Sequence, residues 1–146
     1  MNKRDWLPEK EFKYIYSKVP RLCVDLVIQN ENGVVLSKRD IIPDKGKWHL
    51  PGGTVLNNES LKEAVERIAK SETGLKTKIV NYVGNIEFLR ENPHAHAVSL
   101  VYLVKPVSGK LRGSSQAEEI EFFKKIPVNT IKEHSTFLNE YLKGML

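Results

Sequence analysis

Residues 50–75, LPGGTVLNNESLKEAVERIAKSETGL, constrain the fold more than any other stretch of the sequence. A glycine pair after a proline leads into apolar residues at i, i+3, i+4, i+7 and i+8, the spacing of one helix face. These residues are Leu61, Ala64, Val65, Ile68 and Ala69. One further step on the same face reaches Glu72, so a carboxylate stands where the apolar stripe ends. The stretch predicts a helix that packs on a sheet and carries an acid at the end of that contact.

The rest of the chain predicts strands and two more helices. Residues 8–19 have apolar side chains at helical spacing after a proline, which predicts a short N-terminal helix. Residues 21–29 and 34–39 are β-rich and are joined by Asn-Glu-Asn-Gly, which predicts a hairpin. The remaining predicted elements are strands over residues 76–89, 95–106 and 118–126 and a helical segment over residues 128–146. This order predicts a mixed sheet with helices packed on it.

Composition limits the classes of protein that fit. The length of 146 residues favours a single domain, residues 1–146, and no apolar run approaches the roughly 18 residues of a membrane span. No secretory signal is recognisable, so we expect a cytoplasmic protein. The single cysteine, Cys23, lies in an apolar run and is expected to be a buried, inert thiol. A net charge of +5 favours anionic ligands, and the scattered basic residues favour a small phosphate-bearing molecule over nucleic acid.

Residues within the first stretch also stand at fixed intervals. Five residues separate Gly53 from Glu59, seven separate Glu59 from Arg67, and four separate Arg67 from Glu72. This register, with the glycine and leucine that follow it, resembles the Nudix box. The resemblance implies an α/β protein with the Nudix fold, in which a mixed β-sheet is sandwiched between helices (α/β/α).

The same resemblance implies roles for the residues of the box. Glu72 and the carbonyl of Gly53 or its neighbour would bind Mg²⁺, with Mn²⁺ as an alternative, because such hard ions prefer oxygen ligands. Glu59 and Arg67 would form a structural salt bridge, and phosphate is an alternative contact for Arg67. The family usually has two more acids, at the positions of Ile68 and Ser71 here, so fewer ions can be held.

The altered box ERIAKSETGL and the N-terminal half of the chain are similar to the GDP-mannose mannosyl hydrolase branch, which cleaves the sugar C1–oxygen bond. This resemblance implies that Arg39 binds phosphate and that His96 is the general base. His94 shares the strand face of His96, so a histidine pair for a transition metal is an alternative. Asp25 lies within an apolar strand and should pair with a lysine, an arginine or a sugar hydroxyl.

The segment around Glu119 is similar to the place where ordinary Nudix pyrophosphatases have a supplementary acid, which makes Glu119 an alternative base or ligand. The resulting prediction is a Mg²⁺-dependent hydrolase of a nucleoside diphosphate linked to another moiety, expected to be a nucleotide sugar cleaved at C1. Attack at phosphorus on a nucleotide sugar, dinucleotide or nucleoside triphosphate is one alternative. A degenerate module that senses nucleotides without turnover is another. The expected partner is a small nucleotide substrate, and a homodimer stays open.

Overall fold

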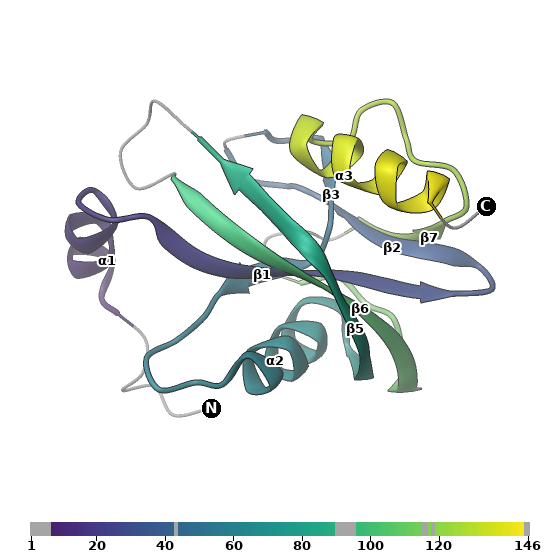
Figure 1. The fold of residues 1–146 in the computed structure, drawn as a ribbon, viewed down its shortest axis with the longest axis horizontal. Helices are drawn as coiled ribbons and strands as arrows, with labels where there is room; N and C mark the ends of the chain where they lie inside the picture. The colour runs from purple at the N-terminus through teal and green to yellow at the C-terminus, as the bar shows by residue number, and fades with distance from the viewer. Residues whose placement is uncertain (1–6, 43, 90–95, 115–116, 118, 145–146) are drawn as a thin grey trace.

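The computed structural model describes residues 7–42, 44–89, 96–114, 117 and 119–144, and within them it has three helices and seven strands (Figure 1). The helices are α1 (Glu9–Tyr16), α2 (Leu61–Thr73) and α3 (Lys132–Lys143). The strands are β1 (Arg21–Asn30), β2 (Gly33–Lys38), β3 (Trp48–His49), β4 (Gly52–Thr54), β5 (Leu75–Phe88), β6 (Ala97–Gly109) and β7 (Glu119–Phe123).

The strands form a mixed sheet in the order β3-β2-β1-β6-β5, with β4 paired to β1 and β7 paired to β2. The pair β1 and β6 is parallel, from Arg21 beside Ala97 to Ile28 beside Val104. The pairs of β1 with β2 and β4, and of β5 with β6, are antiparallel. Strand β1 thus has one parallel neighbour and antiparallel neighbours, so the sheet is mixed, as predicted.

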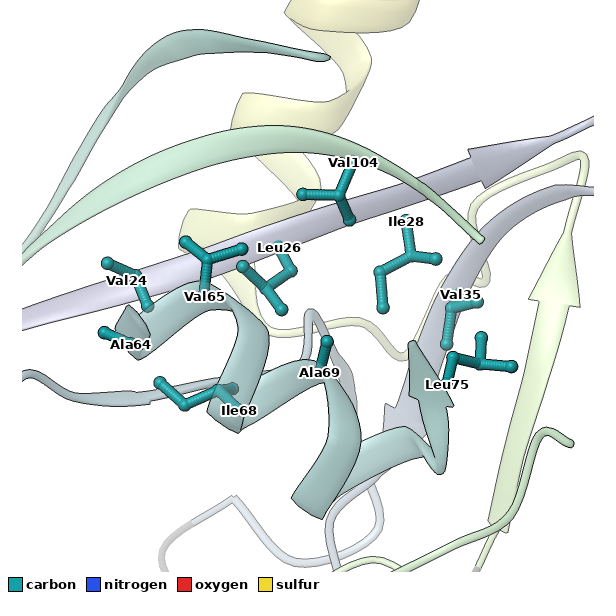
Figure 2. Close-up of a cluster of buried hydrophobic side chains, with 10 residues drawn as sticks. All are labelled: Val24, Leu26, Ile28, Val35, Ala64, Val65, Ile68, Ala69, Leu75 and Val104. Atoms are coloured by element: carbon teal, nitrogen blue, oxygen red, sulfur yellow. The ribbon is translucent and has the colours of Figure 1, made fainter. Parts of the chain in front are cut away.

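Helices α2 and α3 lie on opposite sides of the sheet (Figure 1). On the α2 face, Val65 and Ile68 pack against Val24 and Leu26 of β1, as Figure 2 shows. On the α3 face, Leu138 packs with residues of the opposite pleat, such as Val27. Because successive strand side chains point to opposite faces, Asp25 belongs to the α3 face. The sheet therefore separates two clusters of candidate residues.

Most predicted elements are confirmed, with shifted ends. The hairpin is present, with Gln29 opposite Val34 across the predicted turn. The N-terminal helix ends at Tyr16 and has no buried residue. The C-terminal helix begins at Lys132, later than predicted, because the segment before it pairs with Trp48: Ile131 N–H donates to the Trp48 carbonyl at 2.9 Å.

Strands β3 and β4 are absent from the prediction. Pro51 lies between them and the glycine pair begins β4, and both residue types disfavour a strand when read locally. They form because β2 pairs with β3 and β1 pairs with β4. None of the helices in the described part of the chain is long and apolar enough to cross a membrane.

Candidate active site

Helix α2 has fixed ends, which determines where its side chains point. At its start, Ser60 and Glu63 form a capping box: Glu63 N–H donates to Ser60 Oγ and Ser60 N–H donates to Glu63 Oε1, both at 3.1 Å. At its end, Gly74 has φ +77° and donates its N–H to the Lys70 carbonyl. A side chain there would also meet the Lys110 carbonyl at 2.5 Å, so the position requires glycine.

Glu59 and Arg67 form the predicted salt bridge. Arg67 Nε donates to Glu59 Oε2 at 2.7 Å and Arg67 Nη2 to Oε1 at 3.0 Å, with side chains only 16% and 10% exposed. Arg67 Nη2 also donates to the Thr54 carbonyl at 2.8 Å, and Leu56 N–H donates to Glu59 Oε1 at 3.0 Å. Burial alone would raise the pKa of Glu59, but the bonds from Arg67 and Leu56 bring it below its ordinary value. The pair thus ties the loop after β4 to α2, and the phosphate contact of Arg67 stays a prediction.

Glu72 is half-buried on the last turn of α2, and Ser114 Oγ donates to its Oε2 at 3.0 Å. Gly53 lies against the same helix face one turn earlier, because a methyl group added to it would stand 3.2 Å from Ile68 Cδ1. Glu72 lies one turn beyond Ile68 on that face, and its joint binding of a metal with Gly53 stays a prediction.

The β1–β4 register identifies which backbone carbonyls are available near Gly53. Leu26 N–H donates to the Pro51 carbonyl at 2.8 Å and Val55 N–H to the Leu22 carbonyl at 3.0 Å. In an antiparallel ladder, hydrogen-bonded residue pairs alternate with pairs that are not hydrogen-bonded. Val24 and Gly53 are therefore a hydrogen-bonded pair, and Asp25 and Gly52, the next pair along, are not. The Gly53 carbonyl has one lone pair left beyond the ladder, whereas the Gly52 carbonyl points away from β1.

These donors suit one hard divalent ion. A carboxylate and backbone carbonyls are oxygen ligands of the kind that Mg²⁺ prefers, and they leave positions for water or phosphate. Among the described residues, no group of three or more His, Cys, Asp or Glu side chains could hold a metal. The donor set therefore fits an ion that a ligand helps to coordinate.

On the α3 face, Asp25 has a partner that its sequence position did not predict. Asp25 is 6% exposed and its Oδ2 lies 3.2 Å from Nε2 of His134, which is 4% exposed. Leu50 N–H donates to Nδ1 of His134 at 2.9 Å. Since an N–H can only donate, Nδ1 is unprotonated, and Nε2 carries the ring proton and donates to Asp25. The expected lysine or arginine partner is thus wrong, because the fold brings a residue from α3 next to β1.

His49 lies beside this pair and was also missed. Its Nδ1 is 2.8 Å from the Leu50 carbonyl, which can only accept, so Nδ1 carries the proton and Nε2 is an acceptor. Burial, and to a smaller extent the neighbouring His134 and Arg39, lower the pKa of His49 to about 4 although the Leu50 carbonyl and Asp25 oppose this. His49 is therefore neutral near pH 7. A histidine within the buried stripe of α3, four residues before Leu138, was the sequence signal for His134.

Arg39 and Glu119 lie near the junction of β2 and β7. Arg39 follows β2, its N–H donates to the Lys47 carbonyl at 2.8 Å, and burial lowers its pKa although Asp44 opposes this. Glu119 begins β7 opposite Lys38, at 3.8 Å from its Nζ, and its side chain is 62% exposed. Ile120, the next residue, packs on the α2 face, so Glu119 points to the other face. The structure does not bring Glu119 to Glu72.

His96 lies far from Glu72. It immediately precedes β6, and its carbonyl accepts the Arg21 N–H at 2.9 Å. Glu72 is near the other end of β6, since Leu75 pairs with Gly109. Because a strand rises about 3.3 Å per residue, the two ends of the 13-residue β6 lie tens of ångströms apart. His96 and Glu72 are therefore not brought together, and His94 lies outside the described residues.

Cys23 is buried, and burial raises its thiol pKa, as expected for an inert cysteine.

Comparison of the sequence with models of known protein families identifies the family of this chain. The sequence model of the NUDIX domain matches residues 19–143. The chain belongs to the Nudix family. The predicted α/β/α Nudix fold is confirmed, and the protein is a Nudix hydrolase, an enzyme class that acts on nucleoside diphosphate derivatives with divalent metals such as Mg²⁺ or Mn²⁺.

Two curated relatives and one solved structure are similar to this Nudix hydrolase. An ADP-ribose pyrophosphatase of Methanocaldococcus jannaschii is 33% identical over 90% of this chain and 78% of its own length. The low-salt glycan biosynthesis protein Agl8 of Haloferax volcanii is 42% identical over 56% of this chain, a match that spans 52% of Agl8. A MutT NUDIX hydrolase of Burkholderia pseudomallei superposes with a TM-score of 0.77 at 25% identity, covering 84% of this chain and 98% of that one. The narrower resemblance to mannosyl hydrolases stays a prediction.

Proposed function

We propose that this Nudix hydrolase cleaves a nucleoside diphosphate linked to a sugar, with water attacking phosphorus in the diphosphate. The observation that carries the proposal is Glu72, a half-buried carboxylate oriented by Ser114 on the helix face that also contacts Gly53. The similarity to an ADP-ribose pyrophosphatase over 90% of the chain supports both the substrate class and the attacked atom.

Different residues of the chain would bind the metal, bind the phosphates and fix the loop after β4. Glu72 and the carbonyl of Gly53 or of its neighbour Gly52 in β4 would bind one Mg²⁺. When bound, the ion would neutralise charge on the diphosphate as the linkage breaks. Arg39, whose backbone is bonded to Lys47 and Gly46 just after β2, would bind the phosphates through its guanidinium. The Glu59–Arg67 pair would keep the loop after β4 in place against α2.

Cleavage at the sugar C1–oxygen bond is the second candidate. The positions of Ile68 and Ser71 favour it, because a helix with one acid is poorly equipped to bind the additional ions that would activate water beside phosphorus. Similarity to a glycan biosynthesis protein also favours a nucleotide sugar. In this candidate His96 would be the general base and Asp25 would contact the sugar. The distance of His96 from Glu72 weakens that assignment, so attack at phosphorus is preferred.

Hydrolysis in ¹⁸O-labelled water distinguishes the candidates. ADP-ribose and GDP-mannose would each be incubated with the protein and Mg²⁺, with a parallel reaction in EDTA, and products analysed by mass spectrometry. We expect label on a phosphate and no change of rate in His96→Gln. Label on the mannose released from GDP-mannose, in which the diphosphate is attached at C1, together with a 10²- to 10⁴-fold loss of kcat in His96→Gln, would establish cleavage at C1 instead. Binding of both compounds without hydrolysis would overturn both candidates in favour of nucleotide sensing.

A further inference from the structure

The backbone of Leu50 is held by two histidines that come from different parts of the chain. His49 Nδ1–H donates to the Leu50 carbonyl at 2.8 Å, and His134 Nδ1 accepts the Leu50 N–H at 2.9 Å. The two rings lie near each other, with centroids 6.3 Å apart. Both polar groups of one residue are thus bound by side chains immediately before Pro51 and strand β4. We call these three residues, His49, Leu50 and His134, the Leu50 clamp.

The segment after the clamp, β4, is held by a ladder along one edge, because β1 is its only strand neighbour in the described part of the chain. Pro51 has no N–H, so only its carbonyl takes part in the ladder with β1, where it accepts the Leu26 N–H. Gly52 and Gly53 have the widest conformational freedom of any residues. Gly52 also has to remain glycine, because a methyl group there would collide with Asp25 Oδ1. The Gly52 carbonyl does not take part in that ladder, so its direction depends on how Leu50 and Pro51 before it are fixed.

His134 is in turn restrained by Asp25. The carboxylate accepts the Nε2 proton at 3.2 Å, which fixes the tautomer whose Nδ1 can accept from Leu50. Phe88 packs edge-on to the ring with centroids 5.4 Å apart, so the imidazole has little room to turn. Both ring nitrogens are occupied by bonds to the protein. His134 therefore has no lone pair left for a substrate, and its buried pair with Asp25 is not an acid–base dyad for catalysis.

We propose that His134 is a positioning residue, which acts through the Leu50 N–H to hold the Gly52–Gly53 carbonyls in the geometry that binds the divalent ion. This inference rests on the proposed function, because the ion at Glu72 and Gly53 belongs to that proposal. It gives α3 a role at a site that the local sequence motif assigns to β4 and α2 alone. A partner one step removed from a metal ligand typically changes metal affinity or activity by about 10- to 100-fold.

Two substitutions test the two hydrogen bonds of His134 one at a time. The side-chain oxygen of asparagine can take the position of histidine Nδ1. His134→Asn can therefore still accept from the Leu50 N–H, but it loses the donor at Nε2. The longer glutamine brings its amide nitrogen near the position of Nε2, so His134→Gln can still donate to Asp25 but loses the acceptor for Leu50. Thr136→Asn, at an exposed position on the same helix, is the matched control.

The measurements are Mn²⁺ affinity by electron paramagnetic resonance without substrate, hydrogen exchange of the Leu50 amide, and kcat and KM with ADP-ribose. We expect His134→Gln to weaken Mn²⁺ binding about 10- to 100-fold, to lose Leu50 protection and to lower kcat more than it raises KM. His134→Asn and Thr136→Asn should stay within about threefold of wild type. Unchanged Mn²⁺ affinity in His134→Gln, or equal losses in both His134 variants while Leu50 stays protected, would overturn the inference.

A second measurement covers the case in which His134→Gln does not fold. The ¹⁵N spectrum of the wild-type imidazole should show His134 protonated at Nε2 and not at Nδ1, and a proton at Nδ1 would overturn the clamp. These measurements distinguish failure of the proposed function from failure of the inference about His134. If the proposed function were wrong, the wild-type protein would bind no Mn²⁺ and hydrolyse neither ADP-ribose nor GDP-mannose, while the imidazole spectrum and the Leu50 exchange would be unaffected.

Discussion

The two faces of the sheet assemble their candidate residues in different ways. On the α2 face, Gly53, Glu59, Arg67 and Glu72 all come from one continuous segment, and a partly exposed carboxylate ends the row. On the α3 face, Asp25 and His134 are 109 positions apart in the chain and both are buried. The first face has a partly exposed carboxylate, whereas the pair on the second face is buried and both ring nitrogens of His134 bond to the protein. We infer that the first supplies chemistry and the second supplies geometry.

The largest expected effect is on the α2 face, from Glu72→Gln. Removing the charge of the carboxylate that the proposal assigns to the metal should lower Mg²⁺-dependent turnover by at least about 100-fold, because ligands matter more than the residues that orient them. The thermal midpoint should hardly change, since Glu72 is half-buried and glutamine can still accept from Ser114.

Initial rates with ADP-ribose and Mg²⁺, alongside circular dichroism melting curves, would check this. The matched control is Glu66→Gln, which removes an exposed acid of the same helix whose partner Lys62 is 3.9 Å away. Turnover of Glu72→Gln within about threefold of wild type would end the assignment of Glu72 as a ligand.

The contrast between the faces also explains how far the sequence could predict the molecule. The helix periodicity from Leu61 to Ala69 and the spacing of Glu59 and Arg67 are local, so α2 and its salt bridge were predictable. The hairpin was predictable because its turn residues lie next to both strands. Strands β3 and β4 were not, since pairing with β2 and β1 outweighs the glycines of β4 and the proline between the two strands.

The same reason limited prediction of the site. His134 was visible only as a histidine on an apolar helix face, and nothing in the local sequence connects it to Asp25 or to Leu50. His96 was assigned by resemblance, and the register of β6 shows that it is at the other end of that strand from the residues around Glu72. Similarly, the exposed pairing of Glu119 with Lys38 depends on how β7 joins β2.

A smaller effect is expected on the α3 face, from pH. Burial lowers the pKa of His49 from 6.5 to about 4, so between these values the unfolded chain binds a proton that the folded chain does not. Stability from this group is therefore complete above about pH 6.5 and is lost as the pH falls towards 4. At about 1.4 kcal/mol for each pH unit, the loss is at most about 3.5 kcal/mol.

Urea unfolding at several values between pH 7 and pH 4 would measure this loss in wild type and in His49→Gln. The variant has no imidazole at position 49, so its unfolding free energy should fall less steeply over this range, and the difference isolates His49 from acids that titrate nearby. Parallel curves for the two proteins would mean that His49 is not held neutral by burial.

The smallest expected effect is at the N-terminus of α2, from Ser60→Ala. The substitution removes the Oγ that accepts the Glu63 N–H at 3.1 Å, and losing such a cap costs about 1 kcal/mol of stability. Because Ser60 is exposed and lies twelve positions before Glu72, kcat and KM per folded molecule should equal those of wild type. Urea unfolding and initial rates on the same preparation would test both parts. A loss of kcat without a loss of stability would mean that the start of α2 takes part in catalysis, and the assignment of chemistry to its last turn alone would have to be abandoned.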